Sequence, residues 1–482
     1  MSVLKKTYQL LSLAAGFVLL SVVLSACSLV VDGEYPDVPS DDATKYINIT
    51  ISVSAENNNQ TRAPQGGEYG DGIEKGIDRE NLVNNITLIF YQDNTGINTT
   101  SDDAAVLCVK QYRVRPFTDS DLPESHNHKS TELSSVKENE VLYTTGNQKL
   151  EDTQLRLGQS YKMLVVANAN VDVNVGDKIK TVRDKLTSSI YLGSGSGIDA
   201  ENFVMTSECD ASVTLSNPIA DTSTGENRFV YYFDCIHIER LAARIDYCTS
   251  GASYDGTYNG YVYSTGNGDF YVVTKVTPFN LYNESEYLFK RVQDAWPATA
   301  TTYLGDESTT NYVVDPKTAS KDNEETVISY LSPIAENMNN SYTQAMNSLS
   351  TDQKFTPTGG SETVIIAYPK ENTIMPSSHL KKYATGLAFE VKYYASTSAT
   401  PVIRTYYHYL RHQGELSTGS YQAKQWADLS DTETGSSTVS MNHGIVRNNI
   451  YRVEISGFTD EGIDLKIKVK KWDKFEHAPI YM

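Results

Sequence analysis

Side chains with catalytic or metal-binding chemistry occur in this sequence, but their spacing completes no recognisable site. The segment Glu124-Ser125-His126-Asn127-His128 offers a carboxylate and two imidazoles, which are ligand types of zinc. Its polar neighbours favour a solvated loop over a metal site. The glycine-rich run 193–197 lacks a following helical pattern, which favours a linker over a phosphate-binding loop. Because no His-Glu-x-x-His, Gly-x-Ser-x-Gly or Gly-x-x-x-x-Gly-Lys-Ser/Thr motif occurs, we predict no catalytic residue, metal, cofactor or enzymatic function.

The cysteine at position 27 follows a segment with the features of an export signal, a position at which its thiol could be modified. A basic start and an apolar run from Leu10 to Ala26 lead to it and end in Leu24-Ser25-Ala26-Cys27. Such a run is at the short limit for a membrane-spanning helix, whereas small residues at its end are typical of an export signal. The motif resembles the bacterial lipobox, in which the thiol is acylated before cleavage. We therefore predict a lipoprotein signal peptide over 1–26 and a lipid anchor on Cys27.

The elements that follow are predicted to be strands. From Tyr46 to Ser54 the apolar residues Ile47, Ile49, Ile51 and Val53 alternate with polar ones, a period of two that predicts a strand with one buried face. Later runs such as Tyr161–Ala167 and Phe229–Ile238 are also β-type and lie between connectors rich in Gly, Ser, Thr and Asn. Helical signals are few. The pattern favours an all-β chain of antiparallel sandwiches over βαβ units.

Composition and length agree with this class. The chain has 482 residues, which suggests two or three domains, and its 33 Tyr suit half-buried pleated surfaces. The formal net charge of −19 repels phosphate backbones, so we predict no nucleic-acid partner. The connector 216–227 is the best predicted boundary between domains.

Four cysteines lie beyond the predicted signal. They are Cys108, Cys209, Cys235 and Cys248, and no Cys-x-x-Cys pair occurs among them. Their apolar or strand-like neighbours favour buried thiols over disulfides, because a core of this size does not need covalent crosslinks. The sequence leaves open whether any pair is oxidised.

Several segments, taken in order, resemble those of a known family. The chain is similar to the Bacteroidetes fimbrillins, the lipoprotein-derived pilins of the type V pilus. The matching segments are the lipobox at Cys27, Tyr46–Ser54, Thr61-Arg62-Ala63, Gly158–Asn168, Glu239–Ile245, Tyr368–Thr373, Val446–Tyr451 and Leu465–Trp472. The resemblance implies two transthyretin-like antiparallel β-sandwich domains with a few short helices.

The resemblance also implies a division of the chain. After the signal peptide, residues 27–62 would be a lipid-anchored propeptide that contains a removable first strand. Residues 63–227 and 228–464 would be the N-terminal and C-terminal sandwiches, and 465–482 would be a C-terminal donor tail.

The family's assembly scheme assigns a role to each end of the chain. The precursor would sit on the outer membrane through its lipid until an arginine-specific protease cuts between Arg62 and Ala63. Loss of the first strand would open a groove, and a strand from the next subunit would fill it by β-strand addition. Without the resemblance, Arg62 is more simply an ordinary loop arginine. The competing cut site is Arg79, which has acidic neighbours.

The donor strand is expected near the carboxyl terminus. Its candidate apolar residues are Leu465, Ile467, Val469, Trp472, Phe475 and Ile480. The alternation weakens after Trp472, and Pro479 lacks a backbone donor. Two alternatives therefore stay open: Leu465–Lys471 is the donor itself, or it is the last strand of the second domain and Phe475–Met482 is the donor.

The resemblance implies a structural subunit of a surface fimbria that serves adhesion and colonisation. Its partners would be other fimbrial subunits, the arginine-specific protease, the outer membrane and a surface receptor. A shaft, tip or anchor role is equally open. The alternative from another class is a surface glycan-binding lipoprotein that uses exposed aromatic rings as stacking platforms, and a third is a glycan-degrading enzyme.

Overall fold

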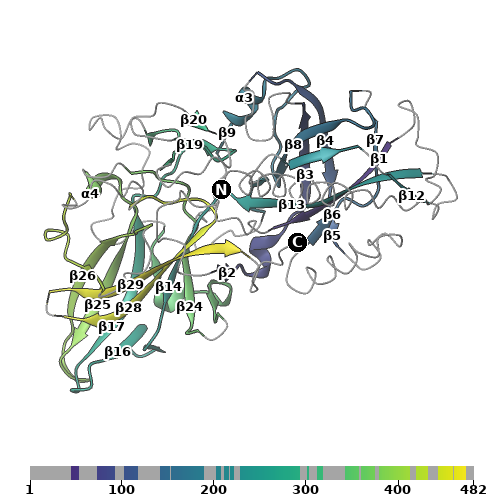
Figure 1. Ribbon diagram of the computed structural model, residues 1–482. Coiled ribbons are helices and arrows are strands. Elements are labelled where there is room, and N and C mark those ends of the chain that lie inside the picture. Colours follow the sequence, from purple (N-terminus) through teal and green to yellow (C-terminus); the bar gives the residue numbers. More distant parts are fainter. Residues whose placement is uncertain are drawn as a thin grey trace, which may run out of the picture. The chain divides into compact units, whose positions relative to one another are not determined.

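Strands dominate the chain from Lys45 onward, as the alternating sequence pattern predicts (Figure 1). The computed structural model describes residues 45–53, 73–92, 103–117, 142–151, 154–188, 202–207, 211–215, 218–221, 228–293, 301–302, 312–318, 342–357, 360–374, 379–412, 420–432, 443–459 and 461–473. Within these ranges the α-helices are α3 (Ile179–Arg183) and α4 (Leu380–Tyr383), each little more than one turn. The prediction of an all-β sandwich-type fold is confirmed.

A large mixed sheet forms the first half. Its main path runs in the order β4-β3-β8-β10-β13-β1-β6-β5, with β11 on β8, β12 on β13 and β7 on β1. The strands are β1 (Lys45–Ser52), β3 (Asn85–Tyr91), β4 (Val106–Arg113), β5 (Arg115–Pro116), β6 (Leu142–Thr144), β7 (Gln148–Leu150), β8 (Ser160–Ala167), β10 (Met205–Ser207), β11 (Ala211–Thr214), β12 (Ile219–Asp221) and β13 (Arg228–Arg240). The long strand β13 pairs with β1 through its first part and with β10 through its end, so it joins the two parts of this sheet.

Two sheets enclose the core of the second half. One has the order β2-β29-β28-β14-β24-β23 with β27 on β29, and the other β15-β16-β17-β25-β26 with β22 on β17. The strands of the first are β2 (Ile73–Lys75), β14 (Arg244–Cys248), β23 (Lys354–Phe355), β24 (Thr363–Ala367), β27 (Tyr421–Ala423), β28 (Asn449–Phe458) and β29 (Ile463–Asp473). Those of the second are β15 (Ser253–Asp255), β16 (Gly260–Ser264), β17 (Phe270–Phe279), β22 (Gln344–Ala345), β25 (Gly386–Tyr394) and β26 (Val402–Tyr409). Ile245 and Ile467 from one sheet and Val273 and Phe389 from the other share one buried cluster, as expected of a sandwich.

Short elements complete the described parts. β9 (Leu186–Thr187) pairs with β18 (Glu286–Tyr287), and β19 (Val292–Gln293) pairs with β20 (Thr301–Thr302) and β21 (Tyr312–Val313). The 3-10 turns are η2 (Asp78–Asn81), η6 (Met346–Ser348) and η7 (Thr351–Gln353).

The place where the chain leaves the first sheet differs from the predicted boundary at 227/228. That position falls at the start of β13, which pairs inside the first sheet. Leu241 and Ala242 lie in the first buried cluster, whereas Ala243 lies in the second. We therefore propose that the boundary lies at 241–243. Residues 44–482 nevertheless form one compact unit, and Tyr368 and Ile450 of the second half are buried in the first cluster.

The start of β25 leaves no room for a side chain at Gly386. A Cβ there would overlap the ring of Phe279 and the backbone carbonyl of His408. We expect Gly386→Ala to lower the free energy of unfolding by about 1–3 kcal/mol, because an added methyl group in a packed core forces its neighbours to move. Urea denaturation measures this. Gly256→Ala is the matched control, since nothing lies within contact of a Cβ at that position. Equal stability of the two variants would contradict the packing described.

Candidate functional site

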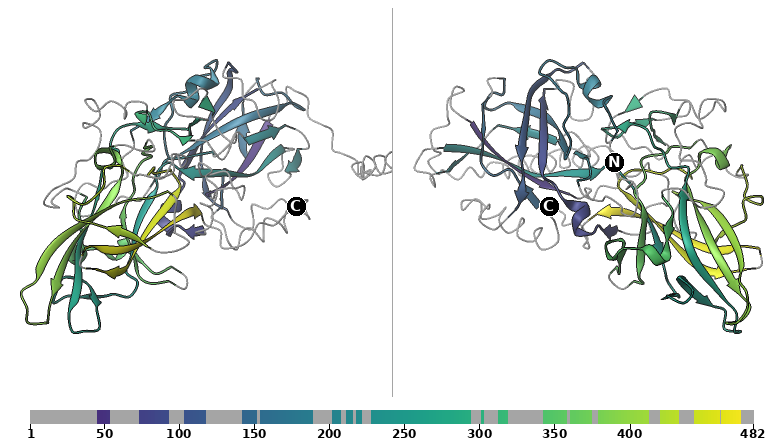
Figure 2. Two further views of the ribbon diagram at one scale, coloured as in Figure 1. Left: turned by 60° about the vertical axis from the view of Figure 1, so that its left-hand side comes forward. Right: turned by 180° about the vertical axis from the view of Figure 1, so that it is seen from behind.

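Strand β1 occupies an interior position of the first sheet although it is the first of the described strands. It runs parallel to β13, with Lys45 opposite Phe229 and Ser52 opposite His237. Its other edge pairs antiparallel with β6 and β7. The ribbon views show the purple β1 beside the teal β13 (Figures 1 and 2). Among the described strands, β6 and β7 join the sheet through β1, and β5 joins through β6. Removing β1 therefore separates β13 from the strands beyond it.

The apolar face of β1 is buried. Ile47, Ile49 and Ile51 are 0% exposed and Val53, just beyond the strand, is 1% exposed. All four belong to the core cluster that also contains Tyr231 and Phe233 of β13. Burying four branched aliphatic side chains stabilises the fold by about 6–12 kcal/mol, at about 1.5–3 kcal/mol each. Since whole domains are stable by only about 5–15 kcal/mol, the first half cannot lose this strand without a substitute.

The other face of β1 is polar and makes specific hydrogen bonds. The Asn48 amide donates to Asn147 Oδ1 at 2.9 Å and accepts from Thr144 Oγ1 at 2.9 Å. At the turn between β6 and β7, Ile49 N donates to Thr145 Oγ1 at 3.0 Å while Thr145 N donates to the Ile49 carbonyl at 3.1 Å. These contacts hold one register, which matters because a slip of one residue would turn the isoleucines out of the core.

The space that β1 fills has the form of a strand-shaped groove. Neighbouring strands lie about 4.7–4.9 Å apart, so without β1 the facing edges of β13 and β6 would stand roughly 9–10 Å apart. Each edge would present unpaired backbone groups, and the floor would be apolar. Such a groove binds an extended segment with apolar residues at alternate positions.

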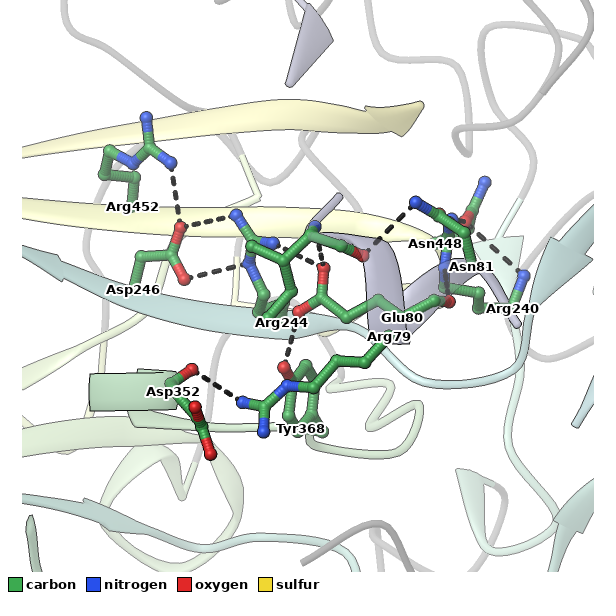
Figure 3. A network of polar contacts seen from close by, with 11 residues as sticks. Arg79, Glu80, Asn81, Arg240, Arg244, Asp246, Asp352, Tyr368, Asn448 and Arg452 are labelled. Carbon is green, nitrogen blue, oxygen red and sulfur yellow. Dashed lines mark hydrogen bonds and ion pairs between the residues drawn. The ribbon is translucent and has the colours of Figure 1, made fainter. Parts of the chain in front are cut away.

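A buried polar network lies just downstream, where the chain passes from β2 into η2 (Figure 3). Glu80 of η2 is fully buried, and its carboxylate accepts from Arg244 Nη1 at 2.8 Å and from the Tyr368 hydroxyl. Arg244 also binds the Asp246 carboxylate at 2.9 and 3.0 Å. Burial lowers the pKa of Arg244, but Asp246 and Glu80 outweigh it and the pKa is raised overall. Burial, with Glu80 beside it, raises the pKa of Tyr368 well above its usual value.

The same network reaches across the two halves of the chain. Arg240, at the end of β13, donates from Nε to the Glu80 carbonyl at 3.0 Å and also binds Asn81 Oδ1. Its Nη1 donates to Asn448 Oδ1 at 3.1 Å, just before β28. Arg452 of β28 donates to Asp246 Oδ2 at 2.9 Å. Segments from both halves are thus held around one 3-10 turn.

A second buried ionic cluster surrounds β18. Lys290 Nζ lies 3.0 Å from Glu239 Oε2, and Arg447 Nη2 lies 2.8 Å from Glu371 Oε2. Arg447 also donates to the Leu288 carbonyl at 3.0 Å. Burial raises the pKa of Glu286, in the same region, to about 8, although Arg447 and Lys370 oppose the shift. This carboxyl group is therefore protonated at acidic and neutral pH.

Several predicted site residues lie outside the residues that the structure describes. They are Cys27, Arg62, Ala63, Phe475 and Ile480, together with the segment 124–128. Their lipidation, cleavage and donor roles stay predictions. Within the described ranges, no cluster of His, Cys, Asp and Glu is arranged to hold a metal ion. Nor does any helix in those ranges have the length and apolarity needed to cross a bilayer.

The candidate donor residues that the structure describes lie in a strand that pairs within the second half of this chain. Leu465, Ile467 and Val469 lie in β29, which pairs with β28 over its length, and all three are 0% exposed in the core of the second half. Trp472 is in the same strand, beside β2. In this structure β29 is therefore part of the second half's own sheet, and which segment acts as donor stays a prediction. Of the four cysteines, Cys108 and Cys248 are buried.

The sequence reasoning missed the Glu80 network. Asp78-Arg79-Glu80-Asn81 has the composition of a surface loop, and only Glu80 three residues after Ile77 hints at a capped turn. The structure shows that turn: Ile77 N donates to Glu80 Oε2 at 2.8 Å. The residues that bury Glu80 come from β14 and from the segment after β24, far away in the sequence.

Comparison with known proteins finds similarity in solved structures alone. No protein-family model and no curated protein matches it. Among solved structures, the C-terminally truncated tip fimbrial protein Mfa3 from Porphyromonas gingivalis is 10% identical with a TM-score of 0.39, over 89% of this chain and 100% of that chain. A fimbrilin (FimA) from Porphyromonas gingivalis W83 is 12% identical with a TM-score of 0.38, over 89% and 98%. The chain is similar to Bacteroidetes fimbrillins.

A further relative is a fimbrial assembly protein from Parabacteroides distasonis ATCC 8503, at 10% identity and a TM-score of 0.33, covering 89% of this chain and 96% of that chain. The family resemblance expected from the sequence is therefore also found in the structure comparison.

The protonated Glu286 predicts a pH dependence of stability. The unfolded chain releases this proton near its ordinary pKa of 4.5, whereas the folded chain keeps it to about pH 8. Because the folded state binds more protons in that window, its stability falls as pH rises through it. We expect Glu286→Gln to flatten this slope and to be more stable than the wild type above pH 8, by on the order of a few kcal/mol.

Urea denaturation between pH 5 and 9 tests this, with the exposed Glu284→Gln as the matched control. Glu284→Gln should keep the wild-type slope. If Glu286→Gln keeps it as well, Glu286 does not hold its proton in the folded state.

Proposed function

We propose that this protein is a structural subunit of a surface fimbria, made as a lipid-anchored precursor and polymerised by exchange of its first strand. The observation that carries the proposal is the position of β1. It is the first described strand of the chain, it lies between β13 and the β6–β7 pair, and its apolar face is fully buried. A terminal segment in a central position can be replaced by a segment of the same form from another molecule.

The groove offers an incoming strand both binding affinity and specificity for its side chains. Main-chain hydrogen bonds along two edges bind any extended strand, whereas the positions of Ile47, Ile49, Ile51 and Val53 accept apolar side chains at alternate positions. Because the incoming strand and the groove belong to different surfaces of the subunit, the contact is heterologous. Heterologous contacts that do not close into a ring grow into filaments.

The donor is proposed to be the segment after β29. Leu465, Ile467 and Val469 are core residues of the chain that carries them, so supplying them to a neighbour would open the second half. Phe475–Met482 follows directly and has Phe475 and Ile480 as apolar residues. This segment is the remaining candidate within the predicted tail 465–482.

The earlier steps follow from the sequence. Lipidation at Cys27 would hold the precursor on the outer membrane, and an arginine-specific protease would cut between Arg62 and Ala63. That cut would remove the anchor and β1 in one piece. The finished subunit would be part of an extracellular fimbrium, with neighbouring fimbrial subunits and a surface receptor as partners and no catalytic role.

The alternative function, glycan binding, depends on exposed aromatic rings. The second half has such rings, for example Tyr254, which is 40% exposed. Tyr254 itself packs edge-to-face with Tyr261 at 5.7 Å and lies under Lys354 Nζ at 5.2 Å. Other rings of this half also pack on one another: Phe270 and Tyr394 stack at 4.9 Å, and Tyr258 contacts both edge-on. Ring faces used in this way are unavailable to a sugar, which favours a structural role for the tyrosines.

Proteolysis of the purified precursor tests the proposed function. Treatment with an arginine-specific protease should cut at Arg62–Ala63 and produce a ladder of SDS-resistant polymers on a gel. Arg62→Ala should stay uncut at that position and monomeric. A wild-type chain that is fully cut there and still monomeric would contradict a shaft subunit, as would a ladder formed by Arg62→Ala.

Substitution in β1 tests whether the strand is removable. Ile49→Asp should destabilise the precursor by about 3–5 kcal/mol, because it places a carboxylate in a dry core. Ile49→Val should cost only about 0.5–1.5 kcal/mol. After the cut, polymers of all three chains should have the same melting temperature, since the altered strand has been discarded. An Ile49→Asp defect that persists at full size in the polymer would show that β1 is retained.

A further inference from the structure

Two arginines lie between β1 and β3, and they are not equivalent. Arg62 is in a stretch rich in Asn, Gln and Gly, whereas Arg79 is in η2. A cut after Arg62 would leave β2 attached to the mature chain. A cut after Arg79 would detach β2 from the chain and split η2. Correct processing therefore requires that a protease of arginine specificity reject the Arg79–Glu80 bond.

The Arg79 side chain is held against the second half. Its Nη2 donates to the backbone carbonyl of Asp352, in η7, at 2.7 Å, and the residue is half-buried (Figure 3). An arginine-specific protease recognises the guanidinium itself. To enter its pocket, Arg79 must first give up this contact and swing out of its position.

The peptide bond after Arg79 is also hydrogen-bonded within the fold. Its N–H, from Glu80, donates to the Ile77 carbonyl at 2.9 Å within the 3-10 turn. One residue further on, the Glu80 carbonyl accepts from Arg240 Nε at 3.0 Å. Proteases cut chain that can be drawn into an extended, accessible form, so η2 must unwind before the bond is attacked.

The Glu80 side chain sets the cost of unwinding. Its carboxylate accepts from Arg244 Nη1 at 2.8 Å, from the Tyr368 hydroxyl and from Ile77 N at 2.8 Å, and it is 0% exposed. Drawing Glu80 out leaves the guanidinium of Arg244 with Asp246 as its remaining carboxylate partner. Breaking one side of a fully buried ion pair is among the most destabilising local changes known in proteins.

We infer that the buried Glu80 carboxylate locks η2 and so protects the Arg79–Glu80 bond, which leaves Arg62 as the processing site of the two arginines between β1 and β3. The inference rests on the proposed function for its biological purpose, but the protection itself is a property of η2. Glu80 is a positioning residue here: it touches Arg244, Tyr368 and Ile77 and acts on the bond through the fold.

Limited proteolysis of the full chain tests the lock. Wild type, Glu80→Gln and Glu80→Ala are treated with an arginine-specific protease, and new N-termini are followed in time by mass spectrometry. The wild type should yield no N-terminus at Glu80. Glu80→Ala should be cut after Arg79 on the order of a hundredfold faster, because cleavage follows the population of the open form and the lost pair is fully buried. Glu80→Gln should lie between them.

Three controls keep the outcome interpretable. Tyr368→Phe removes one hydrogen bond to Glu80 and should give a smaller increase at the same bond, even if Glu80→Ala fails to fold. Glu371→Gln breaks a buried ion pair that does not touch η2 and should leave the Arg79–Glu80 bond protected. Arg79→Lys in the Glu80→Ala background should abolish the new cut.

The inference is overturned if the wild type is cut after Arg79 as fast as Glu80→Ala, or if folded Glu80→Gln and Tyr368→Phe are both as resistant as the wild type. Cleavage at Arg62–Ala63 is read in the same spectra. A resistant Arg62 with a protected Arg79 would defeat the proposed processing and leave the lock standing.

Discussion

The structure of the first half depends on one constraint: a strand from the start of the chain completes a sheet whose other members come much later. Strand β13 lies parallel to β1, and a parallel neighbour cannot be reached by a tight turn. The pairing is therefore made by segments that are far apart in sequence and have no local reason to meet. What holds them together is the buried row of Ile47, Ile49 and Ile51 and the hydrogen bonds along both edges. A strand held in this way is essential to the fold, and the proposed function requires that it can also be replaced.

The network around Glu80 fixes the part of the chain that follows β1 and β2. At η2 itself, Glu80 ties the chain to both halves through Arg240 and Arg244. Upstream, β2 makes a three-residue parallel pairing with the end of β29. The buried charges stabilise little by themselves, because desolvation offsets most of the attraction between them. Their effect is on position: they hold η2 against both halves of the chain.

Sequence reasoning located the strands more reliably than their partners. The alternation at Ile47–Val53 is a local signal, and the predicted strand is present. Its parallel register with β13 is a tertiary property, for which no local pattern exists. The alternation at Leu465–Val469 fits a resident strand and a donor equally, since both have a period of two. In the structure, β28 and β29 form a hairpin, and Thr459 N donates to the Gly462 carbonyl at 2.9 Å where one strand passes into the other. This hairpin makes Leu465–Val469 part of the second half's own sheet. Glu80 could not be placed from sequence, because its burial depends on Arg244 and Tyr368.

Backbone hydrogen exchange in β13 is the most direct measurement of whether β1 fills a replaceable position. In the precursor, the amides within Phe229–Phe233 that point toward β1, rather than toward β12 on the other edge, should be protected. After cleavage at Arg62 and removal of residues 1–62 from a chain that lacks the proposed donor Phe475–Met482 and so cannot polymerise, the same amides should exchange rapidly in the monomer, and adding a synthetic peptide of residues 45–54 should restore their protection. Protection that is unchanged by the loss of residues 1–62, or that the peptide fails to restore, would contradict the account.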